Sequence, residues 1–253
     1  MRILIANPNT TRAMTDLMVA EARATASVGT AIDGMSAEFG VPYISTRSEM
    51  AIAGHALLDL LARRCDGFDA IIVGAFCQPF VAATKELMPV PVLGLTEAAM
   101  RAAQLLGRRI AIIGMGAADR DAHGDIVREL GLETHMAGVR VLPLSGTELA
   151  ADQAAADAAV VELGERAVAE DNADVLVLGG AAFSGMARRI APRLPVPVVA
   201  PVPYALGFAE TIVRAGWRKP STGTFAAVGA KAMQGVSAPL AAMFADPATS
   251  RQD

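Results

Sequence analysis

The feature of this sequence that most restricts its fold is a set of three strand-like segments that recurs in the second half of the chain. The pairs, with the first residue of each segment, are RILIAN at Arg2 and RIAIIG at Arg109, DAIIVGA at Asp69 and DVLVLGG at Asp174, and PVPVLG at Pro89 and PVPVVA at Pro195. Their order is the same, and their offsets lie between 105 and 107 positions. This spacing predicts an internal duplication that gives two lobes with pseudo-two-fold symmetry.

The repeated segments are short apolar runs, each followed by a turn of small residues and a helical pattern. Runs that are apolar on all faces and alternate with helices are typical of buried parallel strands. The expected strands are Ile3–Ala6, Ala70–Val73, Val92–Leu95, Ile110–Ile113, Val175–Leu178 and Val198–Ala200. We therefore predict an α/β fold in which each lobe is a mostly parallel, doubly wound sheet of about four strands with flanking helices.

The chain length of 253 residues suits two lobes, since domains of roughly 100–150 residues are common. We assign residues 1–105 and 206–245 to the first lobe and 106–205 to the second. The helical stretch Ala205–Ala215 should return to the first lobe after the last strand. The polar residues 246–253 are expected to form a frayed tail.

Composition and charge argue against several classes of function. The net charge is −4 and no run of basic residues is present, so no nucleic-acid partner is expected. No stretch approaches about 18 uninterrupted apolar residues, so neither a membrane span nor a secretion signal is expected. Cys65 and Cys77 lack the spacing of a metal or redox motif and fit the reducing cytoplasm. His55, His123 and His135 are scattered, which is typical of surface or capping residues, and we expect no metal.

One glycine pair invites a cofactor interpretation that the neighbouring sequence does not support. Gly114 and Gly116 follow a strand, as in dinucleotide-binding proteins, but Asp119 occupies the position of the third glycine. No acidic residue closes a following strand at the required distance, and a lone GxG is a weak signal. We therefore expect no nicotinamide and no other cofactor.

The turns after the predicted strands are the expected binding site, because parallel sheets bind ligands beyond the carboxyl ends of their strands. Small residues dominate these turns, so backbone N–H groups can contact a small substrate that is anionic or carries a ureido group. Cys77 is the candidate catalytic residue. The candidate substrate-binding residues are Asn7, Asn9, Ala75, Phe76, Gly114, Gly180, Ala181 and Tyr204.

Each polar candidate also has a purely structural interpretation. Asn7 and Asn9 either cap the first helix or hold a carboxylate or ureido group. Tyr204 follows the last strand, where it either reaches the cleft or packs in the core. Cys77 is either a buried, inert thiol or a ligand-facing group that a helix N-terminus activates. Cys65 lies at a predicted helix end, where we expect a structural role.

Longer stretches of the chain resemble one known family. They are RILIANPNTT, VPYIS followed by Glu49, QPFVAATKELMPVPVLGLTEAAM, and DVLVLGG followed by GMARRI. From Met1 to about Ala215 the sequence resembles the aspartate/glutamate/hydantoin racemase superfamily, and most closely its hydantoin and allantoin racemase branch. The resemblance implies a cofactor-independent isomerase that forms a homo-oligomer and has its active site between the lobes. It also implies two cysteines, one from each lobe, that exchange a proton on opposite faces of one carbon.

The sequence departs from that family at both cysteine positions. Alignment without gaps places Ala75 at the first position and Gly180 at the second, with Cys77 two residues beyond the first. One hypothesis is still a racemase that acts on a small carboxylate, an amino acid or a hydantoin-type substrate. A second is a lyase or hydrolase, for example a decarboxylase with Cys77 as lone nucleophile or acid/base group. A third is a non-catalytic binding protein for a small molecule.

Overall fold

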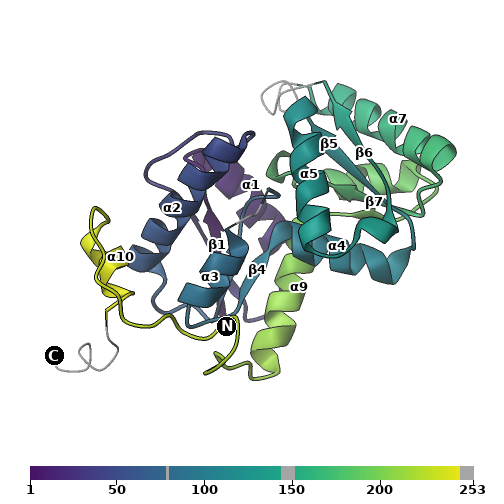
Figure 1. Cartoon of the computed structure of the whole chain (residues 1–253). Coiled ribbons are helices and arrows are strands. Elements are labelled where there is room, and N and C mark those ends of the chain that lie inside the picture. The colour runs from purple at the N-terminus through teal and green to yellow at the C-terminus, as the bar shows by residue number, and fades with distance from the viewer. Residues whose placement is uncertain (78–79, 144–151, 246–253) are drawn as a thin grey trace.

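The computed structural model describes residues 1–77, 80–143 and 152–245, which form two lobes side by side (Figure 1). Each lobe is built on one four-stranded sheet, and the strand pairs of the described residues are all parallel. The strand order is β2-β1-β3-β4 in the first sheet and β6-β5-β7-β8 in the second, so corresponding strands hold corresponding places. The predicted α/β fold is confirmed, whereas the pseudo-two-fold symmetry stays a prediction.

The elements follow the alternation of strand and helix that the sequence predicts. The strands are β1 (Arg2–Asn7), β2 (Ala31–Ser36), β3 (Ala70–Val73), β4 (Val92–Gly94), β5 (Ile110–Met115), β6 (Met136–Leu142), β7 (Val175–Leu178) and β8 (Val198–Val199). The α-helices are α1 (Arg12–Arg23), α2 (Arg47–Arg64), α3 (Val81–Leu87), α4 (Leu95–Leu106), α5 (Ala117–Glu129), α7 (Gln153–Asp171), α8 (Met186–Ile190), α9 (Pro201–Arg214) and α10 (Ala238–Ala242). Short 3-10 helices are η1 (Glu133–His135), η2 (Ala181–Phe183) and η3 (Ala191–Arg193).

Helices cover both faces of each sheet. In the first lobe, Ile3 of β1 belongs to a core cluster with Met18 of α1 and Leu206 of α9. The next residue, Leu4, faces the other way and belongs to a cluster with Leu57 of α2. Because successive strand residues point to opposite faces, a strand with helices on both sides must be apolar throughout.

The second lobe repeats this arrangement. Ile112 of β5 packs in one cluster with Met100 of α4 and Val127 of α5. Ile113 faces the opposite side and packs in another cluster with Val160 of α7. Both strand residues are fully buried. The continuous apolar runs of the sequence thus have the same physical cause in both lobes.

Two helices connect the lobes. After the last strand, α9 places Ala205 in the first lobe's core cluster, where the chain was expected to return. Helix α4 has Leu95 and Ala98 in that same cluster but Met100 and Ala103 in a cluster of the second lobe. Because α4 packs on both sheets, the lobe boundaries assigned from the sequence stay a prediction. The predicted frayed tail, 246–253, lies outside the described residues.

Two strands, β2 and β6, are missing from the set expected from the sequence. Both are edge strands, since each pairs only with one neighbour, β1 or β5. Most of their residues are half-buried, and their sequences AIDGMS and MAGVRVL are not continuously apolar. An edge strand that is partly exposed lacks the all-apolar signal of a central strand.

A buried carboxylate fastens α9 to the loop after α1. Glu210 is only 4% exposed. Its Oε1 accepts hydrogen bonds from the Ser27 backbone N–H at 3.0 Å and from Thr30 Oγ1 at 2.6 Å. Its Oε2 accepts one from Ser27 Oγ at 2.6 Å. Burial raises the pKa of this carboxyl, but the hydrogen bonds from Ser27 and Thr30 and the charge of Arg214 together hold the pKa below its ordinary value.

We predict that Glu210→Ala lowers the free energy of unfolding by about 3 kcal/mol, because four donors, two of Ser27 and one each of Thr30 and Arg214, lose a charged acceptor. Denaturant unfolding at neutral pH measures this loss. The folded-state pKa lies below the ordinary value of 4.5, so the stabilisation is present above that pH and disappears as the pH falls through the folded pKa. The difference between wild type and variant should therefore shrink in acid. Glu165→Ala, at an exposed position of α7, should change stability by less than about 0.5 kcal/mol.

Candidate active site

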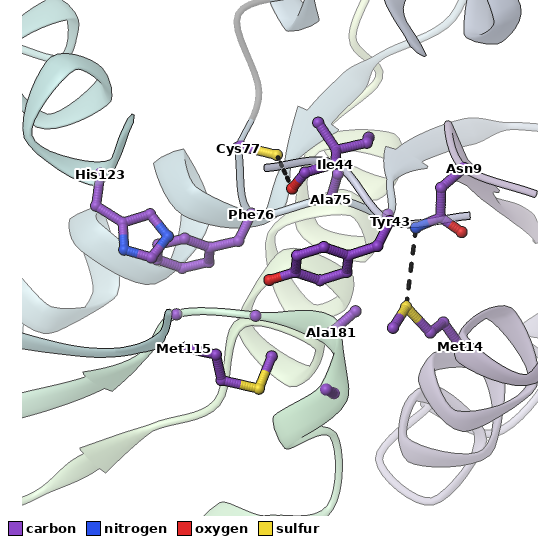
Figure 2. A pocket seen from close by; sticks show the side chains of 14 residues that line it. Asn9, Met14, Tyr43, Ile44, Ala75, Phe76, Cys77, Met115, His123 and Ala181 are labelled. Atoms are coloured by element: carbon purple, nitrogen blue, oxygen red, sulfur yellow. Dashed lines mark hydrogen bonds between the residues drawn. The ribbon is translucent and has the colours of Figure 1, made fainter. Parts of the chain in front are cut away.

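A small cavity lies at the carboxyl ends of the strands, between the two lobes (Figure 2). Its volume is about 40 Å³, which is room for a few water-sized spheres. The lining residues are Asn9, Met14, Tyr43, Ile44, Gly74, Ala75, Phe76 and Cys77 of the first lobe and Met115, His123, Gly179, Gly180, Ala181 and Ala182 of the second.

The turn after β3 forms the first-lobe wall of the cavity. The Gly74 N–H donates to the Ala6 carbonyl at 2.8 Å, which continues the sheet for one residue beyond β3. A Cβ on Gly74 would lie 2.8 Å from Cε of Met18, so the turn approaches α1 too closely for a side chain. The buried Thr96 hydroxyl donates to the Phe76 carbonyl and fixes the far end of the turn. Ala75 and Phe76 both line the cavity, as expected from the sequence.

Cys77 lies at the rim of the same wall. Its side chain is half-buried, it lines the cavity, and its Sγ lies 3.9 Å from the Ile44 carbonyl oxygen (Figure 2). Cys77 therefore borders the cavity, and its catalytic role stays a prediction. Cys65 is instead the C-terminal cap residue of α2, where burial raises the pKa of its thiol, and it does not line the cavity. Its surroundings fit a structural role.

The two asparagines of the first turn have different environments. Asn7 is fully buried, and its Nδ2 donates to Asn9 Oδ1 and Thr15 Oγ1, both at 2.9 Å. Its Oδ1 accepts the Asn9 N–H at 3.1 Å, so the Asn7 amide is used inside the first lobe. Asn9 Oδ1 also accepts the Thr11 N–H. Asn9 lines the cavity, and its Nδ2 points toward Met14 Sδ at 3.8 Å (Figure 2). Asn9 therefore supplies the only side-chain amide among the described lining residues.

The second-lobe wall is the turn after β7. Gly179 and Gly180 lead into η2, and the Gly179 N–H donates to the Ile113 carbonyl at 2.8 Å. Gly180 and Ala181 line the cavity, as expected. The Gly180 N–H, however, points back to the Leu178 carbonyl at 3.1 Å, so it is already used by the protein.

Four positions singled out from the sequence, Asn7 among them, lie away from the cavity lining. Gly114 is the penultimate residue of β5 and packs against the His123 ring, since a Cβ there would lie 2.9 Å from His123 Cε1. Tyr204 lies on α9 and packs against the cluster that contains Phe76. Glu49 completes the capping box at the start of α2. Their contacts with the core or with a helix end fit structural roles.

His123 is the functional candidate that sequence analysis missed, since its scattered position had suggested a surface or capping residue. It is only 2% exposed, lies on α5, and contacts the Phe76 ring edge-to-face at 4.8 Å between centroids. Burial lowers its pKa to about 4, so the imidazole is neutral at pH 7. Its buried Nδ1 has no hydrogen-bond partner among the described residues. An unsatisfied buried polar atom costs roughly 1–3 kcal/mol, which calls for an explanation.

The remaining walls come from residues that no motif identified as ligand contacts. Tyr43 lies in the loop between β2 and α2, and Figure 2 shows its ring reaching across the cavity. Met14 of α1 and Met115 at the end of β5 add flexible thioether side chains. The only sequence signal was indirect: VPYIS was one of the segments that carry the family resemblance.

The cavity is uncharged over its described lining. None of the lining residues is Asp, Glu, Lys or Arg, and His123 is neutral. No group of three or more His, Cys, Asp or Glu side chains is placed to hold a metal ion in the described part of the chain. The helices of these same ranges include none long and apolar enough to cross a membrane.

Comparison with known proteins identifies relatives along most of the chain. A hydantoin racemase of Paenarthrobacter aurescens is 30% identical over 227 residues, which are 89% of this chain and 96% of that protein. The crystal structure of an allantoin racemase from Pseudomonas fluorescens matches with a TM-score of 0.89 at 34% identity, covering 93% of this chain and 100% of that one. Arylmalonate decarboxylase matches with a TM-score of 0.60 at 19% identity, covering 89% and 99%, which shows a common fold alone.

The family match extends over residues 3–209 and is described as Asp/Glu/Hydantoin racemase. This range contains both sheets, apart from Arg2 at the start of β1, and every residue that lines the cavity between them. The resemblance noted in the sequence is thereby confirmed, and the chain belongs to the Asp/Glu/Hydantoin racemase family.

Proposed function

We propose that this protein is an isomerase that moves a proton at the carbon next to a carbonyl group of a small, uncharged, ureido-containing ring. The observation that carries the proposal is the cavity itself. It lies at facing strand ends of two lobes and presents a thiol and an amide donor, with no charged side chain among its described lining residues. Similar proteins are named hydantoin racemase and allantoin racemase, whose substrates are rings of this kind.

The lining favours an uncharged ring over an amino acid. A free carboxylate or ammonium group in a closed cavity needs an opposite charge or several hydrogen bonds, because an unpaired buried charge is costly. The described lining offers no such charge, and the Gly180 N–H is already used. Asn9 Nδ2 can donate to a ring carbonyl without charge pairing. Of the substrates that the sequence left open, the hydantoin type fits this site best.

Cys77 would supply acid/base chemistry at this carbon. A thiol at the cavity rim can exchange a proton with the substrate, and nearby donors can stabilise the negative charge that then forms on the carbonyl oxygen. No cofactor is needed for such a step. This role rests on the position of Cys77 in the lining and on the half-buried state of its side chain.

A second candidate function is a lyase reaction, such as decarboxylation. It is favoured by one observation: Cys77 is the single cysteine among the described lining residues, and the aligned family positions hold Ala75 and Gly180. One thiol is enough to protonate a carbanion from one face. Release of carbon dioxide from a malonate would identify this reaction. Saturable binding without turnover would identify a binding protein instead.

The family resemblance supports three further proposals. The enzyme works without a cofactor, acts in the cytoplasm, and assembles as a homo-oligomer. Sedimentation or light scattering of the purified protein tests the last of these directly. The lobe boundaries at 105/106 and 205/206 are proposed as well, and limited proteolysis tests them.

We predict that the wild-type protein exchanges the α-proton of 5-methylhydantoin or allantoin for deuterium in heavy water. Free aspartate and glutamate should exchange far more slowly, because the described lining has no partner for their charges. Proton NMR follows the loss of the α-proton signal, and chiral chromatography follows the opposite enantiomer. Wild-type protein that exchanges amino acids but no ureide would contradict the substrate assignment.

We predict that Cys77→Ser lowers this exchange by about a hundred- to ten-thousand-fold for at least one enantiomer, since acid/base groups typically contribute that much. Affinity for the ring and thermal stability should change little, because the hydroxyl is similar in shape to the thiol. Cys65→Ser is the matched control and should retain full activity, since Cys65 is outside the cavity. Full activity in Cys77→Ser would remove the thiol from the mechanism.

We predict that Asn9→Asp weakens substrate binding by about tenfold or more, the loss of roughly one hydrogen bond. The substitution keeps the acceptor that Asn7 and Thr11 use but replaces the donor Nδ2 with an oxygen. Titration calorimetry with hydantoin measures the change. Asn172→Asp, at the end of α7 and outside the cavity, introduces the same charge as a control and should bind normally.

A further inference from the structure

The imidazole of His123 occupies a position that the first lobe fills with an apolar side chain. A Cβ on Gly179, the residue after β7, would lie 2.8 Å from Cγ2 of Ile112 and 3.0 Å from Cε1 of His123. A Cβ on Gly74, the residue after β3, would meet Met18 at 2.8 Å and Cγ2 of Ile5 at 3.3 Å. Ile5 and Ile112 are corresponding strand residues in the repeat, so Met18 of α1 and His123 of α5 are corresponding helix residues.

A comparison of Met18 with His123 shows whether packing alone requires a histidine at this position. Met18 is fully buried and fills its position with apolar contacts alone. The packing of a lobe therefore requires no histidine at this point. In the second lobe an imidazole stands there instead, nearly as deeply buried, with its Nδ1 unpartnered among the described residues. Such a polar group, retained where an apolar one packs well, points to a functional role.

The imidazole also borders the cavity, and it comes from the other lobe than the thiol. His123 lines the cavity from the second lobe, whereas Cys77 lines it from the first. Two strand ends make room for the ring, because a Cβ on Gly114 or Gly179 would lie 2.9 Å or 3.0 Å from its Cε1. The Phe76 ring holds it edge-to-face from the first lobe (Figure 2).

We propose that His123 is the second acid/base group of the site, which acts on the opposite face of the substrate carbon from Cys77. This inference rests on the proposed function and gives each lobe one proton-carrying side chain. Gly180, which aligns with the second family cysteine, has no proton to give. His123 lies against Gly179, the residue just before it.

The proton balance closes without a further reactant. In one direction a ring nitrogen of neutral His123 takes the α-proton, and the electron pair of the broken C–H bond moves onto the neighbouring carbonyl as an enolate. The Cys77 thiol then gives its proton to the opposite face, which leaves an imidazolium and a thiolate. In the reverse direction the thiolate takes the α-proton and the imidazolium returns one. Proton exchange with water interconverts the two enzyme forms.

The test uses His123→Met, which places the first lobe's own residue at this position, together with Cys77→Ser. Deuterium exchange into D- and L-5-methylhydantoin is followed separately for each enantiomer. Each variant should no longer racemise the substrate, and its exchange rate for one enantiomer should fall by at least about a hundredfold. The enantiomer whose exchange is slowed should differ between the two variants. His123→Met should also melt no lower than wild type, because it removes an unpartnered buried nitrogen.

Two outcomes would overturn the role of His123. One is exchange of both enantiomers by His123→Met at the wild-type rate, and the other is loss of the same enantiomer in both variants. A wild-type protein that exchanges neither enantiomer defeats the proposed function itself and this role with it. His135→Gln, at the end of η1 and outside the cavity, is the matched control and should exchange both enantiomers normally.

A second variant tests the same proposal with His123 still present. Gly114→Ala puts a Cβ within 2.9 Å of the ring and displaces it, although Gly114 does not itself line the cavity. It should slow exchange of the same enantiomer that His123→Met affects, by at least about tenfold. Gly124→Ala, next to His123 on α5, meets nothing within 4 Å and should be silent. Normal exchange in Gly114→Ala with a displaced ring would contradict the proposal.

Discussion

The site depends on the close approach of a helix to the end of a buried strand, which occurs once in each lobe. Gly74 and Gly179 follow β3 and β7, and at both positions a Cβ would lie within 3.0 Å of a core side chain. Glycine lets the chain leave the sheet beneath the helix, and the next residues then turn into the cavity. Larger residues at these points would push α1 or α5 away from the sheet. The position of the cavity walls is thus fixed by packing below the site.

The central architecture could be predicted from the sequence because burial on both faces leaves a strong signal. The runs Ala70–Val73 and Val175–Leu178 match β3 and β7 at both ends. The edge strands β2 and β6 could not be recognised in the same way, since half-exposed residues such as Arg140 interrupt their apolar pattern. The turns that form the cavity walls could be predicted because they come directly after the central strands. Their residues Ala75, Phe76, Cys77, Gly180 and Ala181 line one cavity.

The parts of the site that were missed depend on helix orientation and loop path, which sequence spacing does not determine. His123 has no periodic partner, and its burial comes from α5 packing over two strand-end glycines. Tyr43 reaches the cavity through an irregular loop. For Asn7 the position at a strand end suggested a ligand contact that the structure does not show. Its amide group donates hydrogen bonds to Asn9 and Thr15 instead. A strand end brings a residue near the cavity, and local hydrogen bonds decide whether its side chain is available.

The repeat in the sequence gives the two lobes corresponding positions with different side chains, and the chemistry that we propose lies in this difference. The position that corresponds to Cys77 at the offset of 105 is Ala182, which also lines the cavity but carries no acidic proton. The position that corresponds to His123 is Met18, which is apolar and fully buried. Each lobe therefore has one inert and one proton-carrying side chain, at different places in the repeat. A reaction that needs groups on two faces of a carbon requires only that the groups face each other, not that they be identical. The expected replacement of both family cysteines, at Ala75 and Gly180, is thus compatible with the chemistry that we propose in this cleft.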